Sequence, residues 1–158
     1  TSNAETHVVP ACLLAPPRIG RVLVRQGRFQ SLDPLWISRR KSLLQVWWHK
    51  RHRNAVCDKF ELYYTATRRR QGFITVDFIY SGQAAGLSSL FGALAVLDVI
   101  AQSREALAIV AHVGNRRISP RLLRRCGWEP HAANLGENHW IKRFYAGYPP
   151  VNLQAYCD

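Results

Sequence analysis

The sequence predicts a single α/β domain over residues 1–158, in which a mixed β-sheet is flanked by helices. Residues 60–67 and 73–80 are rich in β-branched and aromatic side chains, and the Arg-Arg-Arg-Gln-Gly turn between them favours an antiparallel hairpin. A helical stretch at 87–103 and a continuous apolar run within 105–113 follow the hairpin. Strand, helix and strand at this spacing predict a crossover that pairs the two strands in parallel.

The first third of the chain carries weaker signals. Residues 1–20 contain three prolines and are expected to form an irregular lead-in, with a short strand at 21–25 after it. Asp33 and Pro34 predict a helix start, because Asp caps helix N-termini and Pro suits the first turn. This helix would run to about residue 53. Two interpretations stay open for it: a core-facing amphipathic helix with a solvated basic face, or a surface that contacts nucleic acid.

The sequence predicts a short helix followed by two short strands near the end of the chain. Ser119 can cap the helix, Pro120 suits its first position and Gly127 would end it. Short strands are then expected at 128–132 and 139–145.

Charge and composition narrow the classes of partner. Lys and Arg total 22 against 10 acidic residues, a formal net charge of +12, which favours anionic partners such as coenzyme A phosphates, nucleic acid or an acidic protein. No stretch has the length and apolarity of a membrane span, and no secretory signal is evident. The four cysteines are scattered without metal-ligand spacing. We therefore expect a cytoplasmic protein with no metal site and no membrane contact.

Functional residues are expected where the strand at 73–80 passes through a small-residue turn at 81–86 into a helix. The first backbone N–H groups of a helix have no partner inside the helix, and the helix dipole adds partial positive charge there. The sequence therefore predicts an anion site at this junction.

The junction also resembles a known signature. The sequence Gln83-Ala84-Ala85-Gly86-Leu87-Ser88 is similar to the Gln/Arg-x-x-Gly-x-Gly/Ala motif of the GNAT superfamily of N-acetyltransferases, with Ser88 in place of the last Gly or Ala. Further on, Asn115 and the pair Gly127-Trp128 resemble the second half of the same core. Counting back from the glycine puts Leu123 where that family usually has a Tyr that protonates the leaving thiolate. We therefore expect protonation by another group.

The resemblance implies a GNAT-like sheet whose parallel pair is splayed around an acyl-CoA cleft. Acetyl-CoA, or another acyl-CoA, would be the cofactor, and an amine would attack its thioester directly. The backbone near Ile79 or Tyr80 would donate to the thioester oxygen. The cofactor-binding residues implied in this way are Ile79, Gln83, Ala84, Ala85, Gly86, Leu87, Ser88 and Asn115.

The attacking amine must lose a proton, so a base is needed. Asp77 is the one carboxylate in the apolar strand, and burial would raise the pKa of its carboxyl; the alternative is a strand-edge or hydrogen-bonded Asp. His112 lies near the end of the neighbouring strand and has a suitable ordinary pKa, with a structural role as its alternative. Glu61 is a weaker candidate. Tyr80 is the candidate acid in place of the missing family Tyr.

Two functions follow from these expectations. The first is an acyl-CoA-dependent N-acyltransferase whose amine substrate is unknown and is expected to be anionic, such as aminoacyl-tRNA or ribosomal material, because like charges repel. The second is a GNAT-like module that has lost catalysis and binds nucleic acid or a partner protein.

Overall fold

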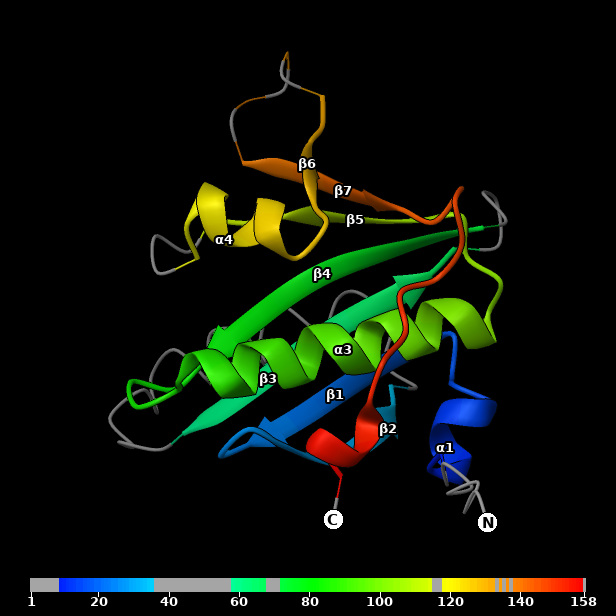
Figure 1. Ribbon diagram of the computed structural model, residues 1–158, viewed down its shortest axis with the longest axis vertical. Helices are drawn as coiled ribbons and strands as arrows, with labels where there is room; N and C mark the ends of the chain where they lie inside the picture. The colour runs from blue at the N-terminus through cyan, green and yellow to red at the C-terminus, as the bar shows by residue number, and fades with distance from the viewer. Residues whose placement is uncertain are drawn as a thin grey trace, which may run out of the picture.

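The computed structural model describes residues 9–35, 58–67, 72–114, 118–132, 134, 136 and 138–157 (Figure 1). Over these residues it is an α/β fold with one seven-stranded sheet in the order β2-β1-β3-β4-β5-β7-β6. Only the β4–β5 pair is parallel among the described strands. The strands are β1 (Ile19–Arg25), β2 (Arg28–Pro34), β3 (Lys59–Ala66), β4 (Phe73–Ser81), β5 (Ala108–His112), β6 (Glu129–Pro130) and β7 (His139–Arg143). The helices are α1 (Ala11–Leu14), α3 (Leu87–Ser103), α4 (Pro120–Arg125) and the 3-10 helix η2 (Leu153–Ala155).

The start of the chain corrects two expectations. The predicted lead-in at 1–20 contains a helical turn, α1, whose Leu13 is fully buried in the core, and β1 already begins at Ile19. The predicted helix start at Asp33 and Pro34 is wrong, because both residues belong to β2. The Asp33 carboxylate accepts a 2.7 Å hydrogen bond from Arg21 across the hairpin instead of capping a helix. Leu35 has no regular structure, and from residue 36 on the predicted helix lies outside the described residues.

A tight turn joins β1 to β2. Gln26 and Gly27 both have positive φ, at 51° and 77°. Positive φ at both central residues is the turn geometry that matches the twist of two antiparallel strands. The Gly27 amide also donates to the hydroxyl of Ser89 at 2.9 Å, so the turn is attached to the first part of α3.

Helix α3 covers one face of the sheet and has the bounds that the sequence predicts (Figure 1). Its inner residues, such as Leu97 and Ile100, pack against strand residues such as Val22, Leu62 and Ile74, all at most 1% exposed. Almost every turn of α3 buries apolar side chains, so this helix lies at the centre of the core. The packing holds both ends of α3 in place against the sheet.

The parallel pair ends where β4 bends. The β4–β5 pairing runs from Phe73 and Ala108 to Val76 and Ala111, whereas β4 continues to Ser81. The β3–β4 register shifts at the same place and leaves Asp77 as the additional residue of a β-bulge. A bulge bends the bulged strand and increases its twist. In Figure 1, β4 accordingly diverges from β5 toward the start of α3.

The last third of the chain contains the short helix and the two short strands that the sequence predicts. The Ser119 hydroxyl accepts from the amide of Leu122 and caps α4, and Gly127 adopts a φ of 83° just after the helix. The predicted strands at 128–132 and 139–145 are present in shorter form as β6 and β7. A buried ion pair of 2.7 Å joins Asp98 of α3 to Lys142 of β7.

Among the described residues, no helix is long and apolar enough to span a membrane. The described part of the chain also contains no cluster of three His, Cys, Asp or Glu side chains placed to hold a metal ion.

Candidate functional site

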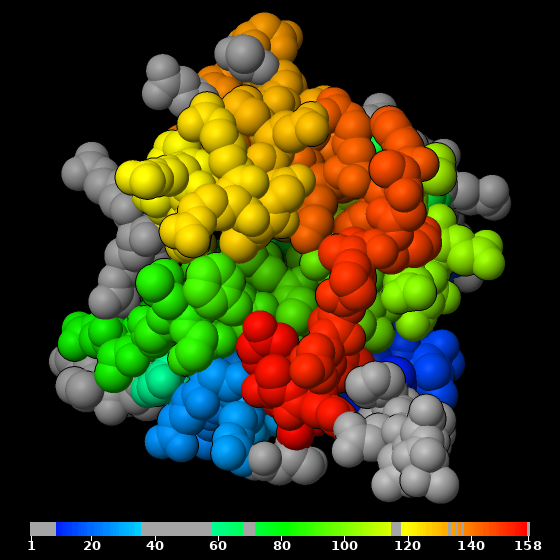
Figure 2. Space-filling model, viewed as in Figure 1, coloured from blue at the N-terminus to red at the C-terminus, as the bar shows by residue number. Residues whose placement is uncertain are grey.

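The junction between β4 and α3 is held by main-chain hydrogen bonds. The amide of Gly82 donates to Lys59 of β3 at 2.7 Å, and the amide of Ala85 donates to Gly82 at 3.1 Å. The first bond of α3 runs from Leu90 to Gly86. The turn is therefore a defined structure that presents the beginning of the helix to the surface, where Gly86 and Leu87 are exposed. Figure 2 shows the start of α3 in green beside α4 in yellow.

Only some of the expected amides remain available to a ligand. Ala85 and Gly86 already donate within the protein, to Gly82 and to Asp58. The amides of Ala84, Leu87 and Ser88 donate no hydrogen bond within the described part of the chain. These three N–H groups, at or next to the positive end of the α3 dipole, are the donors that could hold an anion.

The carboxylate of Asp58 lies at this junction, a position that the sequence does not predict. Asp58 Oδ1 accepts from the Ser89 hydroxyl at 2.8 Å and from the Gly86 amide at 3.4 Å. Its negative charge partly neutralises the helix N-terminus and would repel an incoming phosphate. Asp58 precedes α3 by a long stretch of chain, so no local pattern points to this contact.

A cavity of about 280 Å³ adjoins the junction. Ser81, Ala85, Gly86 and Leu87 form one side of it, and apolar residues from β3, α3 and the segment before α4 form the other, namely Phe60, Leu90 and Ile118. A Cβ atom added at Gly86 would meet only the Ser88 hydroxyl, at 3.7 Å. A side chain at position 86 would therefore project toward the open junction without disturbing the fold.

The space between β4 and β5 on the α3 side is filled with side chains. A cavity of about 10 Å³ remains there, room for about one water molecule. Ile79 from β4 contributes to this packing, and so does Leu123, the residue at the position where the resemblance expects a Tyr; Leu123 is 4% exposed. Trp128 is 3% exposed beside them, and its indole N–H finds no acceptor among the residues that the structure describes.

Asp77 and His112 lie directly after the last parallel pair, one on each strand. Both side chains are exposed, so the burial on which the candidacy of Asp77 depended is absent. Asp77 accepts a hydrogen bond from the Thr65 hydroxyl, and the ring of His112 lies 4.9 Å from the ring of His139. Neither residue lines the two cavities beside the junction. The structure thus places these two candidate bases at corresponding positions of neighbouring strands, outside those cavities.

Glu61 is engaged in a structural charge network. Its carboxylate is 1% exposed, lies 2.6 Å from the Lys59 ammonium and accepts from the Tyr63 hydroxyl at 3.0 Å. Burial raises the pKa of Glu61, but Lys59, the Tyr63 hydroxyl and the charge of Arg21 together lower it further, and the net pKa is below the ordinary value. Such a carboxylate is a weak base. Tyr80 is its cross-strand neighbour in β4 and is half-buried, and Asn115 lies outside the described residues.

Comparison of the chain with family models, with curated proteins and with solved structures finds no match in any of the three.

Proposed function

We propose that this protein is an acyl-CoA-dependent N-acyltransferase with a GNAT-like fold. The observation that supports the proposal best is the order of structural features along β4. Its parallel ladder with β5 stops at Val76, the strand bulges at Asp77, and the chain then enters a small-residue turn and the N-terminus of α3 beside a cavity. A bulge next to a helix start is a common way to open a sheet at a ligand site.

The roles of the residues follow from their places. The amides of Ala84, Leu87 and Ser88 would hold the diphosphate of acetyl-CoA or another acyl-CoA, since main-chain donors at a helix start suit a diffuse anion. The backbone of β4 near Ile79 would donate to the thioester oxygen as negative charge develops on it. An amine would attack the thioester carbon, and His112 or Asp77 would remove its proton through a water molecule. The carbon–sulfur bond would then break, and coenzyme A would leave as a thiolate that takes a proton from Tyr80.

The substrate is expected to carry an amine on an otherwise anionic molecule, such as aminoacyl-tRNA or ribosomal RNA–protein material. The net charge of +12 would repel a polyamine or a basic peptide and attract a phosphate backbone. Electrostatic attraction of this kind raises the rate of encounter more than it determines the chemistry.

The test is the thermal stabilisation of the whole chain by acetyl-CoA, with free adenosine phosphates for comparison. At about 100 times the Kd, a ligand stabilises by about 2.7 kcal/mol, which for a domain of this size raises the Tm by about 5–10 °C. The Gly86→Glu variant should lose this shift, because its carboxylate would occupy the open junction. The Ala146→Glu variant adds the same charge in the exposed turn after β7 and should keep it. Absence of any shift with acyl-CoA would refute the proposal.

A second function is favoured by three features of the same site: Leu123 where a thiolate acid would stand, the Asp58 carboxylate at the anion corner and the filled space between β4 and β5. These fit a GNAT-like module without catalysis that binds nucleic acid or a partner protein. RNA binding that weakens steeply with salt and does not change when coenzyme A is added would favour this function.

A further inference from the structure

A third cavity lies at the other end of α3. It has a volume of about 450 Å³, within the range of small-molecule sites. Its walls come from the C-terminal end of α3, the start of β4, the end of β3 and the residue before β1. Because α3 has 17 residues and rises about 1.5 Å per residue, this cavity is about 25 Å from the junction with β4.

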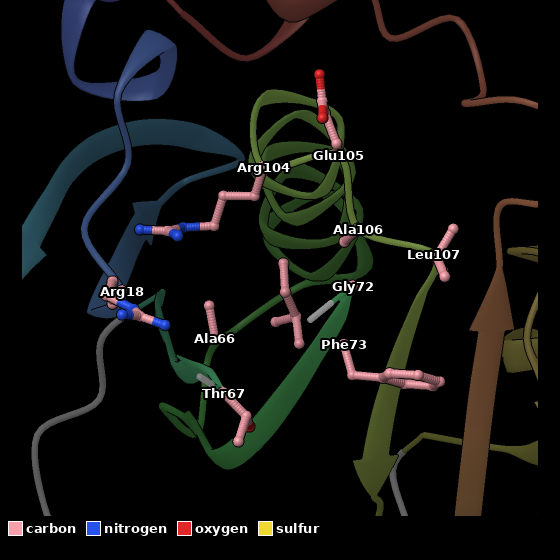
Figure 3. A pocket seen from close by; sticks show the side chains of 10 residues that line it. Arg18, Ala66, Thr67, Gly72, Phe73, Arg104, Glu105, Ala106 and Leu107 are labelled. Atoms are coloured by element: carbon pink, nitrogen blue, oxygen red, sulfur yellow. The ribbon is translucent and has the colours of Figure 1, made fainter. Parts of the chain in front are cut away.

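Two arginines face this cavity. Figure 3 shows the side chains of Arg18 and Arg104 ending on the same side of it, with the carboxylate of Glu105 turned away from both. One Arg104 nitrogen donates to the Pro16 carbonyl at 2.7 Å, whereas its buried Nε finds no acceptor in the described part of the chain. Within the described residues, no carboxylate forms an ion pair with either arginine.

The two cations disfavour one another in this position. Burial lowers the pKa of Arg104, and the positive charge of Arg18 lowers it further. The dipole of α3 accounts for one arginine at its C-terminal end, because cations are favoured there. It does not account for Arg18, which belongs to another segment. Two guanidinium groups at one cavity, with no carboxylate of the described residues paired to either, favour an anionic ligand there.

Most of the other side chains that line the cavity are apolar, and Thr67 and Glu105 are the polar ones among them. The apolar ones are Ala66, Phe73, Ile74, Ala106 and Leu107. Main-chain bonds hold the rim: the Leu107 amide donates to Gly72 at 2.6 Å, and the Ala66 amide donates to the Arg18 carbonyl at 2.6 Å. The backbone at the rim of the cavity is therefore held by the sheet.

We propose that this cavity is a binding site for a small phosphomonoester, with the phosphate between Arg18 and Arg104 and an apolar group against the alanine and leucine wall. A phosphate carries a charge of about −1.5 to −2 at neutral pH and so matches two cations, whereas a carboxylate matches one. Guanidinium groups bind phosphate through paired N–H donors. The site is independent of the proposed acyltransferase chemistry.

The test uses phenyl phosphate as the probe and isothermal titration calorimetry on the whole chain, in a phosphate-free buffer at fixed ionic strength. Phenol serves as the neutral probe and should not bind. Arg18→Gln should weaken phenyl phosphate binding by about tenfold or more, the effect of losing one charged hydrogen-bonding group. Arg121→Gln removes the same charge from the exposed face of α4 and should change the affinity by less than about twofold. Equal weakening by both substitutions would overturn the site in favour of general charge attraction.

A second measurement places the probe. In amide NMR spectra, phenyl phosphate should shift the signals of Gly72 and Leu107 at the cavity; shifts confined to Gly86 and Ser88 would place it at the start of α3 and refute the proposal. Arg104→Lys keeps the charge but loses the paired donors, and it should also weaken binding. A short RNA that binds and loses affinity in Arg18→Gln, with no binding of phenyl phosphate, would make this surface a nucleic-acid contact and would likewise refute the site.

Discussion

The buried ion pair between α3 and β7 makes a strong prediction for stability. Asp98 and Lys142 are 8% and 9% exposed, and their charged atoms are 2.7 Å apart. Lys142→Met removes the ammonium while keeping the straight chain, and it leaves the Asp98 carboxylate in a site that excludes water. Breaking a buried pair in this way costs about 3–5 kcal/mol. For a chain of this size the Tm should fall by about 6–20 °C.

The double variant and a neighbouring pair supply the controls. Asp98→Leu combined with Lys142→Met replaces both charges by apolar groups of similar shape, and it should recover most of the lost stability. Arg143, the next residue of β7, forms an exposed pair with Glu129, with side chains 36% and 63% exposed. Arg143→Met should therefore cost about 1 kcal/mol or less. Denaturant unfolding measured by circular dichroism gives all of these free energies.

The pH dependence gives the same prediction a second measurement. Burial raises the pKa of Asp98 above its ordinary value, although Lys142 partly offsets the effect. An acid whose folded pKa is raised favours the fold at pH values below its unfolded pKa, and this contribution is lost as the pH rises through the folded value. Without Lys142 the folded pKa should be higher still. The penalty of Lys142→Met should then shrink as the pH is lowered, because protonation removes the uncompensated charge. A penalty below about 1 kcal/mol at neutral pH, or one that does not change with pH, would refute this account.

Two further predictions concern the candidate base and the charge network of β3. Asp77→Asn should slow acyl transfer by about a hundredfold, the scale of general base catalysis, and leave acetyl-CoA binding intact; an unchanged rate would remove Asp77 from the mechanism. Tyr63 should stay protonated up to about pH 12, because burial and then the Glu61 carboxylate raise its pKa to about 12. Its contribution to stability is complete below the unfolded value of 10.0 and is lost as the pH rises through the folded value. The unsubstituted chain should therefore lose more stability between pH 10 and 12 than Tyr63→Phe does, and equal losses would contradict the shift.

The candidate site was predictable where it depends on one continuous stretch. The small residues of 81–86 and the apolar helix after them indicated a turn and a helix N-terminus, and both are present. Contacts between distant segments were not predictable. Asp58 reaches the start of α3 from the position just before β3, and no periodicity connects it to Ser89. The bulge at Asp77 depends on the register of β3 against β4, which a single strand does not specify.

The error at Asp33 has the same origin. Asp followed by Pro is a strong local signal for a helix start, but in this chain the Gln26-Gly27 turn pairs the segment with β1. Cross-strand hydrogen bonds and the contact with Arg21 then stabilise the strand, and such tertiary contacts override a local preference.

The amino-acid order by itself determined the hairpin of β3 and β4, the ends of α3, the cap of α4 and the basic character of the surface, since each depends on neighbours a few residues apart. Tertiary structure alone decided that β4 leaves β5 after Val76, that a carboxylate stands at the helix start and that Arg18 meets Arg104 at one cavity. These features arise when segments far apart in the chain pack around one core. Local sequence patterns do not determine the geometry of that packing.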